Sequence, residues 1–271
     1  MDFGMKNRMA KIFNPKDGKT VMLAVDHGYF QGPTTGLRDM KNIIPLIPQA
    51  DCLFVTRGIL RNCIDPKIET SVCLRVSGGP SILGELSNED ITTSMEEALR
   101  LNASGVGMSM YVGAKNEDRT ITNLGRLINE AERFGMPVLA ITAVGKEMVR
   151  DARYIGLACR IAAEFGAHIV KTYYCDGFED VVAGCPVPIV IAGGKKLPEM
   201  DALKMTENAM KAGASGVDMG RNIFQSDSPI GMIKAVKAIV HKGATAEEGY
   251  EIYQKNKKSA VGGIDQSMEK V

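Results

Sequence analysis

The sequence predicts an α/β protein in which residues 1–271 form a single (β/α)8 TIM-barrel domain, and three observations lead to this prediction. Eight short apolar runs recur along the chain, segments with helical spacing lie between them, and two of the runs resemble each other. Eight parallel strands that alternate with helices are typical of a barrel of this length. A doubly wound α/β sheet is the alternative for the same alternation.

The eight runs have the composition of strands that are buried on both faces. Most of them lack the alternation of polar and apolar residues that marks a half-exposed strand, as expected for a parallel sheet covered by helices. In chain order they are TVMLAVDH (20–27), DCLFVT (51–56), SVCLRVS (71–77), GVGMSM (105–110), PVLAIT (137–142), HIVKTY (168–173), PIVIAGG (188–194) and GVDMGR (216–221).

Helical segments fill the intervals and have recognisable ends. Proline near the start and glycine just past the end mark several of them. We expect helices over 89–102, 126–134, 154–165 and 199–212, and a last one near 245–258. Thr245 and Glu248 have the spacing of a capping box at the start of this last helix. Residues 259–271 are expected to form a flexible C-terminal tail.

The internal similarity favours the barrel over the doubly wound sheet. ASGVGMSM at 103–110 and ASGVDMGR at 214–221 fall at the fourth and eighth predicted strands. A repeat of half a barrel would place them there.

Composition narrows the class of protein. Hydrophobic residues make up 45%, charged residues 24%, and the net charge is +1, which argues against a broad surface for nucleic acid or anionic membrane. The first residues lack the apolar core of a signal peptide, and no run approaches membrane-spanning length. The six cysteines form no C-x-x-C pair, and the three histidines lack zinc-ligand spacing. We therefore expect a cytoplasmic protein with free thiols and no metal.

The loops after the last two strands have the features of a phosphate site. Function in such barrels gathers at the carboxyl ends of the strands, and phosphate is usually bound after the seventh and eighth. Gly193 and Gly194 follow the seventh run, Gly220 and Arg221 follow the eighth, and GRNIFQ can begin a short extra helix. These four residues are our candidates for binding the phosphate of a substrate, although glycines can also simply turn tight corners.

Lys171 is the candidate nucleophile, because it stands within a short apolar run at the end of the sixth strand. Lysine is almost never fully buried without a partner. It can extend its amine to the surface or pair with Asp26, or it can form an iminium with a phosphorylated keto substrate beside the phosphate site. An ordinary lysine has a pKa of about 10.4 and only about one in 2,500 is neutral at pH 7, so such a site must favour the neutral amine.

Asp26 and His27 are the acid–base candidates, because they end the first predicted strand and therefore face the same barrel mouth. Asp26 can stabilise a carbinolamine or move protons, and an ordinary histidine titrates near neutrality. The alternative is that Asp26 caps a loop and His27 packs against its neighbours.

Four segments together resemble a known family. AVDHGYFQGP (24–33), IVKTYY (169–174), VPIVIAGGKK (187–196) and ASGVDMGRNIFQ (214–225) are similar to the class I aldolase group that includes archaeal-type fructose-bisphosphate aldolases. The resemblance implies a Schiff base on Lys171, a pocket containing Asp26, and phosphate held by the glycine loops and Arg221. It also implies a (β/α)8 barrel without a permanent cofactor, assembled into a large, decamer-like homo-oligomer.

One position departs from the archaeal pattern. Ala143 stands where that pattern has a tyrosine after the fifth strand, and alanine cannot move a proton. The departure favours a thiolase branch of the group, in which an acetyl unit of a phosphorylated diketone passes to coenzyme A and leaves dihydroxyacetone phosphate. The alternatives are a sugar-phosphate aldolase, with water or His27 replacing the tyrosine, and a non-catalytic barrel that binds sugar phosphates.

Overall fold

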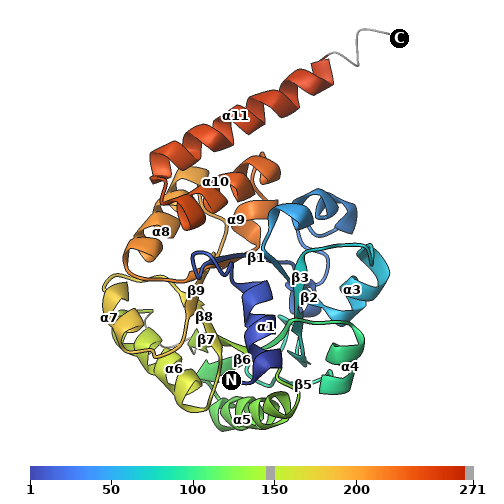
Figure 1. Cartoon of the computed structure of the whole chain (residues 1–271), viewed down its shortest axis with the longest axis vertical. Coiled ribbons are helices and arrows are strands. Elements are labelled where there is room, and N and C mark those ends of the chain that lie inside the picture. Colours follow the sequence, from blue (N-terminus) through green and yellow to red (C-terminus); the bar gives the residue numbers. More distant parts are fainter. Residues whose placement is uncertain (145–149, 266–271) are drawn as a thin grey trace.

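A computed structural model describes residues 1–144 and 150–265, with side chains through residue 257 apart from residue 144. In this part of the chain, eight parallel strands close into a barrel in the order β1-β10-β9-β8-β7-β6-β3-β2, as Figure 1 shows along the barrel. The predicted (β/α)8 barrel is therefore confirmed. The strands are β1 (Thr20–Ala24), β2 (Cys52–Thr56), β3 (Ser71–Arg75), β6 (Gly105–Val112), β7 (Val138–Val144), β8 (Ile169–Tyr173), β9 (Ile189–Ala192) and β10 (Gly216–Met219).

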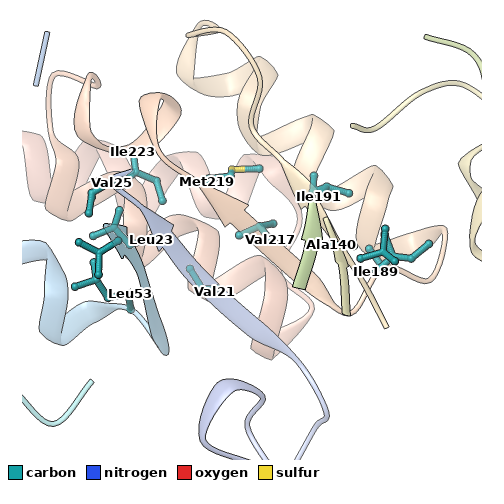
Figure 2. Close-up of a cluster of buried hydrophobic side chains, with 14 of the residues drawn as sticks. Val21, Leu23, Val25, Leu53, Ala140, Ile189, Ile191, Val217, Met219 and Ile223 are labelled. Atoms are coloured by element: carbon teal, nitrogen blue, oxygen red, sulfur yellow. The ribbon is translucent and has the colours of Figure 1, made fainter. Parts of the chain in front are cut away.

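Each of the eight predicted runs coincides with one barrel strand, although β6 and β7 continue past the predicted ends of their runs. The two similar segments belong to β6 and β10, the fourth and eighth strands of the barrel. The outer layer of the barrel is apolar: Figure 2 shows Val21, Leu23, Val217 and Met219 in a cluster of buried side chains with Ile223. A barrel whose strands are covered by helices on the outside needs this continuous apolar layer.

Side chains along each strand alternate between the outer layer and the barrel interior. In β8, Ile169 belongs to the inner cluster and Val170 to the outer one, so Lys171 points into the barrel one layer above Ile169. The same alternation turns Arg75 in β3 and Asp218 in β10 inward. Three charged side chains thus enter the barrel near its carboxyl end.

Helices surround the barrel, and several follow their predicted limits. They are α3 (Arg57–Cys63), α4 (Met95–Arg100), α5 (Glu117–Arg133), α6 (Ala152–Glu164), α7 (Phe178–Ala183), α8 (Glu199–Lys211), α10 (Pro229–Lys242) and α11 (Ala246–Asp265), with short α2 (Gly28–Gln31) and α9 (Arg221–Phe224) and two 3-10 turns, η1 (Met40–Asn42) and η2 (Ile44–Gln49). The capping box is confirmed, because Thr245 N donates to Glu248 Oε2 (2.8 Å) and Glu248 N donates to Thr245 Oγ1 (3.2 Å).

The predicted helix over 89–102 is wrong in its first half. Asp90–Ile91 forms a short strand, β5, paired with β4 (Ser77–Gly78), and the helix begins only at Met95. Ser94 caps this helix by accepting a hydrogen bond from Glu97 N. The β-branched residues at 91–93 suit an extended chain better than a helix, which explains the later start.

The N-terminal helix α1 (Phe3–Ile12) was not predicted. It lies across one end of the barrel (Figure 1), and Ile12 belongs to the inner cluster with Met22 and Phe54. Gly105 makes room for it, since a Cβ there would lie 2.8 Å from Ile12 Cδ1. The end of the barrel opposite the carboxyl ends of the strands is therefore filled by apolar side chains.

The last helix includes residues 259–265, and Figure 1 shows α11 extending away from the barrel. Residues 266–271 lie outside the described residues, so the flexible tail expected over 259–271 stays a prediction. No helix in the described part of the chain is long and apolar enough to cross a membrane.

Candidate active site

A cavity of about 140 Å³ lies at the carboxyl ends of the barrel strands. The structure brings all the predicted site residues together around it: Asp26, His27, Lys171, Gly193, Gly194, Gly220 and Arg221. Ala143 lines the same cavity. The strand ends that sequence reasoning selected are therefore neighbours in space.

Lys171 is buried in this cavity and is paired with a carboxylate. Its side chain is 9% exposed, and Nζ lies 2.8 Å from Oδ2 of Asp218. The same Nζ lies 5.3 Å from the centre of the Phe54 ring, which forms the layer beneath it. The carboxylate partner is Asp218 rather than Asp26. The buried Lys171 amine thus has an ion-pair partner, lies above the Phe54 ring, and faces the cavity on its other side.

Asp218 was missed by sequence reasoning, although its strand carried a signal. It is the inward-facing residue of GVDM, and an acidic residue at such a position needs a buried partner. Burial raises the pKa of Asp218, while the adjacent Lys171 opposes the rise. Apart from Lys171, neither carboxylate oxygen has a hydrogen-bond partner among the described residues. The Asp218 carboxylate is therefore buried in the barrel with the Lys171 amine as its ion-pair partner.

Arg75 organises the opposite wall of the cavity, a role that sequence reasoning did not assign. Its side chain is 4% exposed, and Nη1 donates to Asp26 Oδ2 at 3.2 Å. Nη2 contacts Glu89 and Tyr29 and lies 2.6 Å from Ser109 Oγ. Burial would lower the pKa of Arg75, but Glu89, Tyr29 and Asp26 together raise it above its ordinary value. A permanent cation therefore holds Asp26 at the rim of the site.

His27 lies beside Asp26, with 3.8 Å between His27 Nδ1 and Asp26 Oδ1. Burial lowers the pKa of His27 to about 4; Asp26 opposes this shift, while Lys171 and Arg221 add to it. The imidazole is consequently neutral near pH 7 and does not titrate there, unlike an ordinary histidine. Its buried Nδ1 has no hydrogen-bond partner among the described residues.

The two glycine loops are joined by a buried amide. Asn222 Nδ2 donates to the carbonyl of Gly193 (2.6 Å), and Asn222 Oδ1 accepts from Leu197 N (2.7 Å). The predicted short helix is confirmed as α9, which begins at Arg221 and contains Asn222. Gly220 permits the close approach of β1, since a Cβ there would lie 2.4 Å from the carbonyl oxygen of Ala24. One side chain thus fixes the loop after β9 against the loop after β10.

Arg221 provides positive charge at this end of the cavity. Its Nε is buried and has no hydrogen-bond partner in the described part of the protein. An unpaired guanidinium N–H beside two glycine loops is the arrangement that an anionic group such as phosphate would complete.

Ala143 has a tyrosine as its immediate neighbour. In the register between β6 and β7, Tyr111 is the partner of Ala143, and both line the cavity. Neighbouring partners in a parallel pair project to the same side of the sheet. Burial raises the pKa of Tyr111 to about 12, with Glu89 adding to the shift. A phenol is therefore present near position 143, although it comes from the preceding strand of the barrel.

Metal ligation has no obvious place in this site. Among the residues with described side chains, no group of three or more His, Cys, Asp or Glu is arranged to hold a metal ion. The carboxylates of Asp218 and Asp26 at the cavity are instead paired with cations, Lys171 and Arg75 respectively.

Comparisons with known proteins agree with this geometry. Residues 20–226 match the family described as DeoC/LacD family aldolase. The chain is 58% identical over 259 residues to the 3-hydroxy-5-phosphonooxypentane-2,4-dione thiolase of Escherichia coli strain K12, covering 95% of this chain and 89% of the relative. It is also 58% identical over 255 residues to an uncharacterized aldolase of Pasteurella multocida, covering 93% of this chain and 88% of that one.

Solved structures with this fold include two of archaeal fructose-1,6-bisphosphate aldolase. A crystal structure of an archaeal fructose 1,6-bisphosphate aldolase has a TM-score of 0.80 at 29% identity, covering 88% of this chain and 100% of that chain. A second archaeal structure has the catalytic lysine covalently bound to the carbinolamine intermediate of the substrate, with a TM-score of 0.79 at 29% identity. This second match covers 87% of this chain and 99% of that chain.

Proposed function

The chain belongs to the DeoC/LacD family of aldolases, and from this premise we propose that it cleaves a phosphorylated diketone through a Schiff base on Lys171. It is an enzyme of the class I aldolase type. The proposed reaction is that of its thiolase relatives: an acetyl group passes from 3-hydroxy-5-phosphonooxypentane-2,4-dione to coenzyme A, and dihydroxyacetone phosphate remains. The observation that carries the proposal is the buried Lys171 amine, 2.8 Å from Asp218 and facing the cavity with the glycine loops.

The first step is activation of the amine. Asp218, whose pKa is raised by burial, takes the proton of the Lys171 ammonium within the pair. The neutral amine then attacks the ketone beside the phosphate-bearing carbon, and loss of water from the carbinolamine gives an iminium. Asp26, held by Arg75, lies at the same cavity and moves the protons that addition and dehydration require.

The second step breaks the carbon–carbon bond. The sulfur of coenzyme A bonds to the acetyl carbonyl carbon, and the bond from that carbon to the hydroxyl-bearing carbon breaks. Its electron pair moves to the iminium nitrogen and gives an enamine on Lys171. The Tyr111 phenol, near Ala143, supplies the proton to the enamine carbon, which replaces the proton lost by the thiol. Water then hydrolyses the new iminium and releases dihydroxyacetone phosphate.

The phosphate binds at the other end of the cavity. The loops that carry Gly193, Gly194 and Gly220 surround it with backbone, and Arg221 donates the N–H that lacks a partner. Asn222 keeps the two loops at a fixed separation. The phosphate therefore sets the position of the ketone relative to Lys171, which is how a remote group contributes to the rate.

A sugar-phosphate aldolase is the second candidate, because the archaeal fructose-bisphosphate aldolases share the fold at 29% identity. Retro-aldol cleavage also proceeds through a lysine iminium but needs a base for the substrate hydroxyl and no thiol. Ala143 supplies no such base, and the pKa of His27 near 4 makes its imidazole a weak one. These two residues favour the thiolase reaction over the aldolase reaction.

Two experiments test the proposal. Borohydride reduction in the presence of dihydroxyacetone phosphate, followed by intact mass and peptide mapping, should place one adduct on Lys171. Formation of acetyl-coenzyme A from the diketone should require coenzyme A, and cleavage should stop without it. Full-rate cleavage without coenzyme A would favour the aldolase, and the absence of any adduct would leave only a barrel that binds sugar phosphates.

The setting of the enzyme forms part of the same proposal. We place it in the cytoplasm, where phosphorylated intermediates and coenzyme A are available, and the six cysteines are free as a reducing compartment requires. We also infer a large homo-oligomer. Light scattering coupled to gel filtration measures its mass, and a monomer would contradict the inference.

A further inference from the structure

A second cavity, of about 420 Å³, adjoins the candidate active site. Asp26 and Tyr29 line both cavities and form the boundary between them. The second cavity lies between the segment after β1 and the start of α3, on the opposite side of Asp26 from Lys171's strand. It is therefore continuous with the β1 wall of the active site and lies on the opposite side of β1 from β10.

The active-site cavity alone is small for a reaction between two substrates. Its volume of about 140 Å³ lies below the roughly 300–1,000 Å³ that ligand sites usually have. A phosphorylated diketone seated between Arg221 and Lys171 leaves little space for a co-substrate with a long arm. The thiol must consequently enter from a neighbouring space.

The lining of the second cavity suits an extended and mostly apolar arm. Val25, Leu37, Met40 and Ile59 give it apolar walls, and Asn62 offers a polar group. Three glycines, Gly28, Gly32 and Gly58, also line it, and no atom lies within 4 Å of the place where a Cβ of any of them would stand. The space beside these glycines is open, and Gly28 directly precedes Tyr29, one of the two residues that form the boundary.

Two cations stand at this cavity without partners. Arg38 lines it and is exposed, and Arg57 is exposed between the lining residues Thr56 and Gly58. Among the described residues, neither Arg38 nor Arg57 has an ion-pair or side-chain hydrogen-bond partner. Coenzyme A carries phosphate groups at the nucleotide end of its arm. The positive charge of Arg38 and Arg57 therefore complements the negative phosphates of coenzyme A.

We propose that the second cavity binds coenzyme A, with the pantetheine arm along Val25, Ile59 and Gly58 and the nucleotide phosphates near Arg38. The thiol then reaches the acetyl carbonyl across the boundary formed by Asp26 and Tyr29. This inference rests on the proposed thiolase function and adds to it the place where the second substrate binds. It separates the two substrates by chemistry: the phosphorylated diketone enters at the glycine loops and the thiol at the β1–α3 side.

Gly58→Leu is the decisive variant, because it fills the cavity without disturbing the fold. Gly58 lies in α3 with an ordinary helical conformation, and its side-chain position meets no atom within 4 Å. Leucine is a better helix former than glycine, so the helix is not weakened. The KM for coenzyme A should rise about tenfold or more, as expected when bulk occupies a binding space. The borohydride adduct on Lys171 should form as in the wild type.

Gly156→Leu is the matched control. Gly156 lies inside α6, also has no atom within 4 Å of its Cβ position, and lines neither cavity. This variant should keep the wild-type KM for coenzyme A. Arg38→Glu should raise the KM for coenzyme A while leaving that for pantetheine, which lacks the nucleotide phosphates, unchanged. Arg126→Glu, an exposed cation on α5, is the charge control.

The results separate this inference from the proposed function. If the wild type forms no acetyl-coenzyme A, the thiolase function itself fails. If the wild type forms it and Gly58→Leu does so with an unchanged KM, the function stands and the binding site is wrong. If Gly58→Leu instead changes the oligomer mass in light scattering while coenzyme A use is unaffected, the cavity is a contact between copies of the chain, which also overturns the inference.

Discussion

Replacing Lys171 by methionine should make the stability of the protein depend on pH. In the wild type the Lys171 amine lies 2.8 Å from Asp218, and Asp218 is 1% exposed. Methionine matches much of the lysine stem and removes only the charge. The variant therefore leaves a buried carboxylate that has lost its ion-pair partner.

The magnitude follows from the burial of the carboxylate. Removing one member of a buried ion pair costs about 3–5 kcal/mol. Asp218 can reduce this cost by taking up a proton, since burial already raises its pKa and Lys171 no longer opposes the rise. A carboxyl with a raised pKa in the folded state favours folding most below its unfolded pKa of about 3.9, and this advantage is lost as pH rises. The loss has a maximum slope of about 1.4 kcal/mol per pH unit, at pH values between the unfolded and the folded pKa of the carboxyl.

Urea unfolding at fixed protein concentration, from pH 5 to pH 8, measures this effect. Lys171→Met should lose stability steadily over the range, relative to a Lys171→Met/Asp218→Asn double variant that lacks the carboxylate. Neither variant should form a borohydride adduct. If the difference in unfolding free energy between the two variants is the same at pH 5 and pH 8, Asp218 is not the buried charge, and the reasoning about the pair fails.

Three further predictions concern other contacts of the structure. His241→Gln should destabilise the protein by about 1 kcal/mol at pH 6 and by less at pH 9, in thermal melts. His241 bonds to Asp51 and Asp17, its pKa is raised chiefly by the Asp51 hydrogen bond, and its stabilisation is lost as pH rises through that raised value. Asn222→Ala should cost about 1–3 kcal/mol, because a buried carbonyl and N–H lose their partner, and should raise the KM for the phosphorylated substrate in steady-state assays. Tyr111→Phe should slow solvent exchange of the C3 hydrogens of dihydroxyacetone phosphate about 10²- to 10⁴-fold, measured by NMR, while the lysine adduct still forms.

Each of these three predictions can be contradicted by a specific result. Equal melting differences at pH 6 and pH 9 would show that the imidazole of His241 carries no linked proton. An unchanged KM in Asn222→Ala would mean that the two loops hold their positions without the amide. Wild-type exchange in Tyr111→Phe would assign the proton to another group, and Tyr174→Phe, which packs against Phe178 outside the cavity, is the control for loss of a hydroxyl.

The barrel and its nucleophile could be predicted because both depend on local patterns. Apolar runs of strand length define the strands, and the position of Lys171 at the end of one run places it at the mouth. The pairing of Asp218 with Lys171 could not be predicted in this way. Their strands, β10 and β8, are separated by β9, and their side chains meet only because the closed barrel turns both into its interior. The inward position of Asp218 in a buried strand was nevertheless visible in the alternation, and would have marked it as a residue in need of a partner.

Arg75 and α1 were missed for different reasons. The partners of Arg75 come from several segments far apart in the sequence, including Glu89 and Asp26, and no spacing rule connects them. Helix α1 buries only Met5 and Ile12 among its ten residues, so it lacks the broad apolar face by which helices are recognised. The pKa of His27 also depends on surroundings that the sequence alone does not reveal.

The bond between Asn222 and the two glycine loops bears on how such an enzyme can diverge. The loops after β9 and β10 are tied to each other, whereas Arg75 and Tyr111 come from β3 and β6 on the other side of the barrel. Substitutions near position 143 can therefore change which bond is broken without altering the residues that bind the phosphate. A lineage that must accept a substrate without phosphate faces the opposite situation, since it has to remodel both loops at once.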